Sequence, residues 1–367
     1  MKVAASTAPV LFGVMQGAEP TVSTRQLNRA VLDRQHLLAR ADLDITSTLE
    51  HVGGLQTQYA PSGYIGLWSR LADFERGALT SALDDRWVVQ GTLMRSTIHM
   101  VSAGDFWPIC AAIRASRREW WLRIAKSRKL PEIDHDELAE VVREALARGP
   151  LRSGDIVAAM HAAGFDKPYW EGAGLWADMV RVPPSGTWDR RRADLYGLAE
   201  HWIPRIEVDE TDGLRLLLTR YLRAFGPAAL ADAATWSGVP RSRLEPVVAA
   251  MELATYRDET GTVLFDLAGS ELPDPATPAP VRFLPTWDAT LLAHCRRSGI
   301  LPEQFRTAIF HTKIPQSVGT VLVDGSVAAT WAWRADHVEV DELVTLTVRQ
   351  RREVTHEADR LTEFYRD

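Results

Sequence analysis

The sequence is poor in cysteine, and this scarcity limits the kinds of site that it can build. Its two cysteines, Cys110 and Cys295, lie far apart in the chain. Neither belongs to a Cys-x-x-Cys pair or to a cysteine and histidine spacing that would hold a metal. A metal site built on cysteine is therefore not expected, and we interpret each thiol as a buried structural side chain.

Long apolar runs and several common catalytic motifs are also missing. No stretch approaches the roughly 20 apolar residues that cross a membrane, which favours a cytoplasmic protein. The first twenty residues hold one lysine and a short apolar patch, a poor match to a secretory signal. We expect residues 1–20 to be a disordered leader or an added extension. Phosphate-cradling glycine loops, zinc-protease motifs and nucleophile elbows are absent as well.

The overall composition is typical of a folded globular protein. The chain has 367 residues, of which 46% are hydrophobic and 25% charged. This length predicts two or three domains at roughly 150 residues each. The formal net charge is −6, which does not exclude nucleic-acid binding, because binding depends on where the charges lie rather than on their sum.

Two local clusters of basic residues stand out against the negative total. Residues 114–129 contain seven basic residues and one acid, Glu119, for a local net charge of +6. The second cluster surrounds the turn at residues 183–186. Its members are Arg181, Arg190, Arg191 and Arg192. Each cluster predicts either a surface that binds phosphate or simply a solvated face.

The first part of the chain has the pattern of a winged-helix unit. Ser23 precedes an amphipathic helical repeat as a candidate N-cap. A second helical pattern breaks at Gly53-Gly54. Residues 87–102 then alternate as in a hairpin, the wing of such a unit, with the side chains of Arg95 and His99 expected on one face. Asp105 is the predicted cap of a long helix that continues through Lys129.

The same pattern returns more weakly twice, which predicts an α+β, mainly helical fold of three tandem winged-helix units with a C-terminal β-containing domain. In the second unit, residues 195–203 are expected to be wing strand. In the last domain we expect strands at residues 308–310, 320–323 and 329–333, a hairpin turn at Asp324-Gly325, and a helix after about Glu342. The predicted boundaries are 1–20 for the leader, 21–130, 131–215 and 216–270 for the three units, 271–280 for a proline-rich linker, and 281–367 for the C-terminal domain.

Two glutamines, Gln56 and Gln58, follow Gly53-Gly54 and are the most distinctive candidates for chemistry. Neutral amides donate and accept hydrogen bonds but do not act as ordinary acids or bases. Residues two apart point in different directions on a helix and share a face in extended chain, so the pair converges only if this segment is extended. Spacing alone leaves them as two surface residues of a loop.

A family resemblance gives the pair a function. The segment HVGGLQTQYAPSGYIGLWSRL (51–71), with LNRAVLDRQHLLAR (27–40) before it and GTLMRSTIHMV (91–101) after it, resembles the Gln-x-Gln signature of the winged-helix DNA glycosylases of the AlkZ and YcaQ type. These residues are close to those of the azinomycin-resistance member of that family. The resemblance extends from about Thr21 to the C-terminus, and no helix-hairpin-helix glycosylase signature is present. Thr57 stands where the signature implies a nonpolar residue.

The resemblance implies a monofunctional DNA glycosylase with Gln56 and Gln58 as the catalytic pair. Its implied substrates are cationic 7-alkylguanines, including interstrand crosslinks such as those of azinomycin B, in a role of antibiotic self-resistance. The implied partner is double-stranded DNA with alkylated or crosslinked guanine, and the implied protein is a monomer without cofactor or metal. An alkyl group on position 7 makes the base cationic, so it can depart without a general acid. An aspartate at the second position would add general-base power, typically about 10²–10⁴-fold.

Basic side chains are the candidates for DNA contact. They are Arg95, Arg114, Arg117, Arg118, Arg123, Arg190 and Arg191, together with His311 and Lys313, which the resemblance places in a DNA-probing hairpin. His99, on the expected wing strand, is interpreted as a packed structural residue rather than a catalyst.

Two other classes of function remain open from the sequence. A winged-helix transcriptional regulator would dimerise and prefer a palindromic sequence. A non-catalytic damage sensor or drug-sequestering protein would bind lesions without releasing a base.

Overall fold

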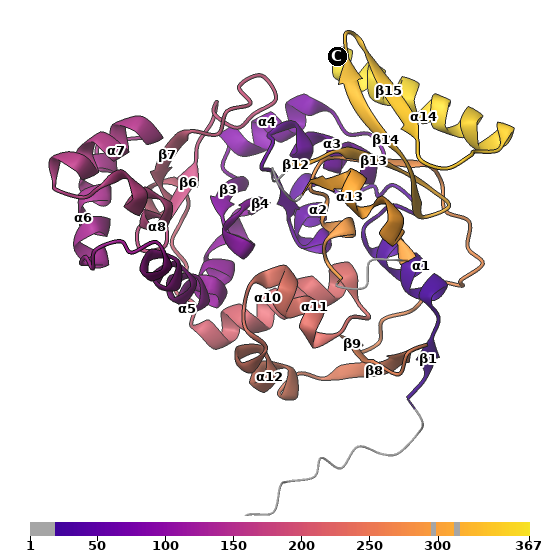
Figure 1. Cartoon of the computed structure of the whole chain (residues 1–367), viewed down its shortest axis with the longest axis horizontal. Helices are drawn as coiled ribbons and strands as arrows, with labels where there is room; N and C mark the ends of the chain where they lie inside the picture. Colours follow the sequence, from indigo (N-terminus) through magenta and orange to yellow (C-terminus); the bar gives the residue numbers. More distant parts are fainter. Residues whose placement is uncertain (1–18, 295–298, 312–315) are drawn as a thin grey trace, which may run out of the picture.

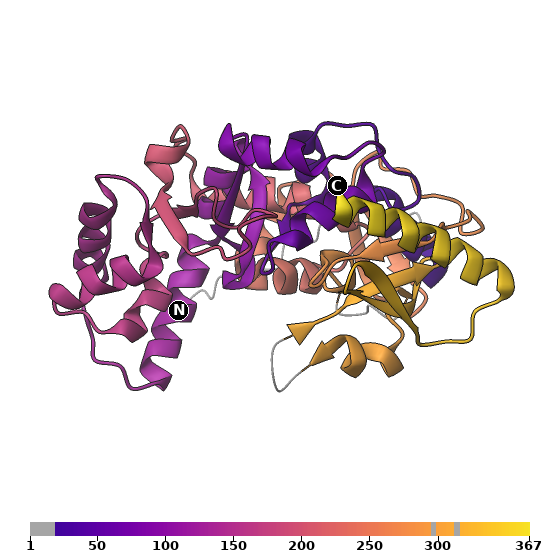
Figure 2. The ribbon, with the colours of Figure 1, turned by 90° about the horizontal axis from the view of Figure 1, so that it is seen from above.

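The computed structural model describes residues 19–294, 299–311 and 316–367, and it shows an elongated molecule of mixed helix and sheet (Figure 1). Residues 135–173 form one end of the molecule, and the C-terminal sheet and helix form the other (Figure 2). The mixed, mainly helical fold class is confirmed, whereas the division into three winged-helix units stays a prediction. Within these described residues, no helix is both long and apolar enough to span a bilayer.

The described part of the chain begins slightly before the predicted end of the leader. Residues 1–18 lie outside the described part, but Glu19 forms an ion pair with Arg257 at 2.7 Å, and the Pro20 carbonyl accepts a hydrogen bond from the Arg257 N–H. Strand β1 (Thr21–Val22) then pairs in parallel with β8 (Leu253–Asp258), which pairs with β9 (Val263–Leu267). Residues 19–22 are thus joined to the third predicted unit.

The first predicted unit begins with four helices, followed by the expected hairpin. These are α1 (Thr24–Arg34), α2 (Ile45–Val52), α3 (Pro61–Arg70), α4 (Arg76–Asp84), β3 (Val88–Thr92) and β4 (Ile98–Ser102). Ser23 caps α1 by accepting a hydrogen bond from the Gln26 N–H, as predicted. Gly53 ends α2 with a φ of 77°, a conformation that favours glycine.

One six-stranded sheet runs through the first two predicted units. Its order is β2-β4-β3-β6-β7-β5, with β2 at Leu55–Gln56, β5 at Leu151–Arg152, β6 at Met179–Arg181 and β7 at Leu195–Leu198. Strand β3 pairs with both β4 and β6, so the sheet continues across the predicted boundary at residue 130. The expected strand over residues 195–203 is wrong in its second half, because Ala199–Trp202 forms the helical turn α9.

Two long helices pack side by side, and the first of them contacts strands β3 and β4. Helix α5 (Ala103–Ser127) lies along α10 (Glu210–Phe225). A Cβ added at Gly213 would lie 2.6 Å from the Pro108 carbonyl oxygen, so glycine permits this close approach. The predicted cap of α5 is wrong: Ser102 is the N-cap, and Asp105 instead forms an ion pair with Arg220 at 2.8 Å. The helix begins before Asp105 because Ser102, also a favoured cap residue, directly ends strand β4.

The remaining helices of the middle of the chain cover the sheet and the two long helices. They are α6 (His135–Leu146), α7 (Ser153–Ala162), α8 (Trp170–Ala173), α11 (Leu230–Ser237) and α12 (Arg241–Ala249). Figure 1 shows α6 to α8 gathered beside β6 and β7, away from α11 and α12.

The C-terminal domain contains a four-stranded antiparallel sheet covered by a helix. The sheet order is β10-β13-β14-β15, with β10 at Arg282–Leu284, β13 at Gly319–Val323, β14 at Ser326–Arg334 and β15 at His337–Glu342, and the helix is α14 (Val348–Arg366). The strand expected at 308–310 is wrong, because Arg306–Ile309 forms the helical turn α13 and only β11 (Phe310–His311) is extended. In such a short apolar run, periodicity does not distinguish a strand from a helical turn.

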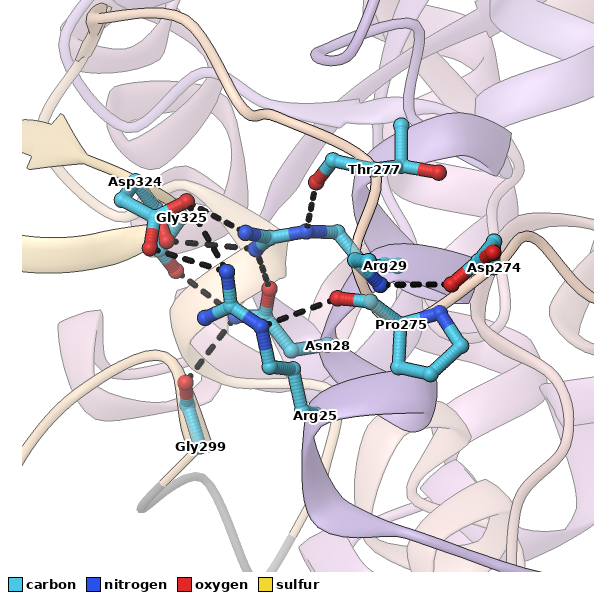
Figure 3. Close-up of polar contacts among 10 residues, drawn as sticks. Arg25, Asn28, Arg29, Asp274, Pro275, Thr277, Gly299, Asp324 and Gly325 are labelled. Carbon is cyan, nitrogen blue, oxygen red and sulfur yellow. Dashed lines mark hydrogen bonds and ion pairs between the residues drawn. The ribbon is translucent and has the colours of Figure 1, made fainter.

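The predicted hairpin turn at Asp324-Gly325 docks the C-terminal sheet onto α1 (Figure 3). Arg25 and Arg29 both form ion pairs with Asp324. Asn28 Nδ2 donates to the Gly325 carbonyl at 2.7 Å, and Arg29 Nε donates to the carbonyl of Thr277 in the predicted linker at 2.6 Å. The C-terminal domain and the linker are therefore tied to the helix that opens the chain.

Candidate active site

Gln56 lies in the short strand β2 beside the β3–β4 hairpin, and Gln58 follows in a bend. After α2 ends, Leu55 pairs with Met100 and Gln56 pairs with His99 of β4. The backbone approaches the hairpin closely, since a Cβ on Gly54 would lie 3.0 Å from the Met100 carbonyl oxygen. Gly54 also has a φ of 77°. The glycine pair thus turns the chain sharply and lets the glutamine segment join the sheet.

The side-chain carbonyl oxygen of each glutamine accepts a hydrogen bond from the hairpin, at or next to the connection between β3 and β4. Gln56 is 8% exposed, and its Oε1 accepts from Arg95 Nη2 at 2.8 Å. Gln58 is exposed, and its Oε1 accepts from the Ile98 backbone N–H at 2.7 Å. Between them, the Thr57 N–H donates to the Ile98 carbonyl at 2.8 Å. Both side-chain amides are therefore oriented by a single structural element.

Thr57 occupies the signature position where a nonpolar residue is implied, and its environment is nonpolar. The residue is 1% exposed, and among the described residues its Oγ1 has no hydrogen-bond partner. Its Cγ2 lies close to Gly63 on α3, where an added Cβ would be 3.0 Å away. Thr57 therefore packs through its methyl group.

Arg95 lies in the connection of the hairpin rather than on a strand. Its φ is 52°, so the expectation that it shares a strand face with His99 is wrong: the backbone turns at this residue. Besides Gln56, its guanidinium donates to the carbonyl of Trp236 at the end of α11. Burial lowers the pKa of Arg95 to about 10, and the side chain stays charged at neutral pH.

His99 is a packed neutral histidine in this structure. It is 2% exposed, and burial lowers its pKa to about 3. Its Nδ1 lies 3.1 Å from the Thr97 carbonyl oxygen, which can only accept, so Nδ1 carries the proton. Nε2 of the neutral ring is then an acceptor, and His99 is the residue that pairs with Gln56 in the sheet.

The basic cluster on α5 does not form a continuous solvated face. Arg114 forms an ion pair with Asp178 at 3.1 Å, and Arg118 donates to the Leu175 carbonyl at 2.9 Å. Arg117 is 9% exposed, and burial lowers its pKa to about 10. Of the candidates for DNA contact on this helix, Arg123 is the exposed one.

The second basic cluster reaches the residue next to Gln58. Arg190 and Arg191 are exposed in the loop between β6 and β7, and Arg191 Nη1 donates to the Tyr59 hydroxyl at 2.9 Å. Tyr59 directly follows Gln58 and is 40% exposed. Sequence reasoning missed Tyr59; an aromatic residue next to the signature was the available signal. Arg181, by contrast, is buried and donates to the Thr92 and Tyr196 hydroxyls.

The predicted DNA-probing hairpin is only partly within the described residues. The backbone of His311 belongs to β11, which pairs with β12 (Gln316–Ser317). Lys313 lies outside the described residues.

Comparison with known proteins gives a family and a structural relative. The family model for "DNA glycosylase AlkZ-like" matches residues 49–364. Among solved structures, the DNA glycosylase AlkZ of Streptomyces sahachiroi superposes with a TM-score of 0.79 at 18% sequence identity, covering 94% of this chain and 97% of that chain. This likeness shows a shared fold. No curated protein matches the sequence.

Proposed function

Because this chain belongs to the AlkZ-like DNA glycosylase family and is thus a DNA glycosylase, we propose that it hydrolyses the glycosidic bond of cationic 7-alkylguanines at Gln56 and Gln58. The observation that carries this proposal is the arrangement of two unionisable amides, each oriented by a hydrogen bond from one hairpin. In the described part of the chain, neither side-chain amide has a carboxylate as a hydrogen-bond partner. The site therefore suits a leaving group that needs no proton.

The chemistry balances without a general acid. When the bond between the sugar and the cationic base breaks, its electron pair moves to the base, which departs neutral. Water adds to the sugar carbon, and its proton passes to solvent, leaving an abasic site. The protein has to position the water and the lesion, and fixed amide dipoles can do both.

The hydrogen bonds in the structure specify which amide atoms remain available. Both Oε1 atoms already accept one protein hydrogen bond. A carbonyl oxygen has two lone pairs, so each can still accept one from water, and each NH₂ group can donate. The pair can thus hold a water and a base together.

Exposure at the site supports the finer proposal that crosslinks between guanines are substrates, such as those of azinomycin B, in a self-resistance role. Gln58 and its neighbour Tyr59 are exposed. A guanine tied to the opposite strand cannot be flipped into a closed pocket in the usual manner. A surface site beside the exposed Arg190 and Arg191 would act on such a guanine without flipping it. We further propose that the protein acts as a cytoplasmic monomer on double-stranded DNA.

Release of free base is the decisive measurement. Purified protein is incubated with a duplex containing 7-methylguanine, and the released base is quantified by chromatography. A glycosylase releases 7-methylguanine and leaves an abasic site, whereas a transcriptional regulator or a sequestering protein releases nothing. A duplex with a crosslink between two guanine N7 atoms then tests the finer proposal, and the Gln56→Ala/Gln58→Ala double variant is the control.

A further inference from the structure

The contact between Arg95 and Gln56 fixes which way the Gln56 amide points. A guanidinium has N–H donors and no acceptor, so the Gln56 atom that lies 2.8 Å from Arg95 Nη2 must be the carbonyl oxygen. Glutamine amides are otherwise ambiguous, because oxygen and nitrogen can exchange places. With Oε1 held by Arg95, Nε2 points away from it, and Nε2 has no hydrogen-bond partner among the described residues.

We propose that Arg95 is a positioning residue that locks the Gln56 amide, so that its NH₂ group donates a hydrogen bond to the departing base. Purine ring nitrogen and carbonyl oxygen are the acceptor atoms that such a donor would meet. They become stronger acceptors as the electron pair of the breaking bond moves onto the base, and a fixed donor there stabilises the transition state more than the ground state. This inference rests on the proposed function.

The backbone conformation and the packing around Arg95 hold its side chain in place for this contact. Arg95 and the next residue, Ser96, both have positive φ, a conformation that non-glycine residues rarely adopt. The end of α11 fits closely against this turn, since a Cβ on Gly238 would lie 3.3 Å from the Arg95 nitrogen. Arg95 also donates to the Trp236 carbonyl there, so the third predicted unit holds the guanidinium in place.

Arg95 carries its charge without an ion pair among the described residues, in contrast to the buried Arg34 and Arg70. Arg34 and Arg70 each form a two-pronged ion pair with an aspartate. Arg95 contacts a neutral amide and a backbone carbonyl, and desolvation lowers its pKa to about 10 without an ion pair to offset the cost. The buried Arg117 and Arg282 also have a pKa lowered to about 10 and no ion pair among the described residues. It is therefore the contact of Arg95 with Gln56 that points to a role in the site.

A double-mutant cycle tests whether Arg95 acts through Gln56. Arg95→Met removes the donors and keeps the aliphatic stem, and it should slow single-turnover base release by about tenfold or more. The dissociation constant for DNA and the melting temperature should change little. In the Gln56→Ala background, the same substitution should produce no further loss, because the group that it orients is gone. Arg95→Lys retains a donor and should recover part of the rate.

Arg86→Met is the matched control. Arg86 also has positive φ, at 67°, and also donates to a tryptophan carbonyl, that of Trp202, but it does not contact Gln56. This variant should release base at the wild-type rate.

The Gln56→Glu variant tests whether residue 56 acts as a hydrogen-bond donor or as an acceptor. Glutamate keeps both acceptor oxygens and can pair with Arg95, but it has no N–H, so its rate should be as low as that of Gln56→Ala. A wild-type rate for Gln56→Glu, or fully additive effects of Arg95→Met and Gln56→Ala, would overturn the inference. If Arg95→Met does not fold, Gln56→Glu and Arg95→Lys decide the question. Failure of the wild-type protein to release base would refute the proposed function instead.

Discussion

Gln56 and Gln58 differ in exposure although both are held to the hairpin through their carbonyl oxygens. Gln56 is nearly buried next to Arg95, whereas Gln58 is exposed next to Tyr59. We predict that Gln56→Ala and Gln58→Ala each slow base release by at least about tenfold, since removal of one oriented dipole from a catalytic site costs that much or more. The double variant should be slower than either single one. DNA affinity and melting temperature should stay near wild type, and wild-type rates in both single variants would remove the pair from the mechanism.

The buried His99 makes stability depend on pH in a defined direction. Its pKa is about 3 in the folded protein, against about 6.5 when unfolded. Between these values the unfolded chain binds a proton that the folded protein does not. The stabilisation is therefore fully present above pH 6.5 and is lost as the pH falls, by about 1.4 kcal/mol per unit.

Denaturant unfolding at several pH values from 7.5 to 4.5 checks this prediction. In His99→Asn, which keeps a donor for the Thr97 carbonyl but does not titrate, the free energy of unfolding should fall less steeply on acidification. Some slope should remain, because His36 also has its pKa lowered by burial, to about 4. Parallel curves for the two proteins would show that His99 is not the neutral buried group described above.

Among the structural elements, the loop between β6 and β7 is better placed for DNA contact than helix α5. Its exposed Arg191 contacts Tyr59, next to the signature, and the neighbouring Arg190 is exposed as well, whereas Arg117 on α5 is buried. Neutralising Arg190 and Arg191 to glutamine should lower the slope of log affinity against log salt by about 0.9 for each lost phosphate contact. Arg349→Gln on α14, where Arg349 is exposed and paired with Glu353, is the control. An unchanged slope in the loop variant would exclude the loop from the interface.

Elements whose signals are local were predictable from the sequence. The Ser23 cap, the break at Gly53, the wing hairpin and the Asp324-Gly325 turn each depend on a few neighbouring residues, and the structure contains all four. Where two local signals competed, prediction went wrong: Ser102 caps α5 in place of Asp105, whose carboxylate pairs with Arg220, a residue 115 positions away.

At the scale of the whole molecule, the catalytic candidates were predictable but their surroundings were not. The glutamines are carried by a contiguous signature. The contact of Arg191 with Tyr59 joins residues 132 positions apart, and that of Arg95 with Trp236 joins residues 141 apart. Such contacts depend on how the predicted units dock, which no local pattern encodes. On α5 likewise, the partners of Arg114 and Arg118 are Asp178 and the Leu175 carbonyl, which lie 64 and 57 positions away.

The last prediction concerns which lesions the whole site can excise. In the described residues, the amides of Gln56 and Gln58 have no carboxylate partner, and His99 is neutral with a pKa far below physiological pH. The enzyme must then rely on the positive charge of the lesion to make the base leave. Duplexes with 7-methylguanine, or with a crosslink between two guanine N7 atoms, should lose base, whereas neutral ethenoadenine and hypoxanthine should stay intact at protein concentrations that give equal binding. Gln58→Asp should extend release to more stable adducts if its carboxylate reaches the attacking water. Efficient release of hypoxanthine by the unmodified protein would reveal an acid or base elsewhere in the fold and refute this mechanism.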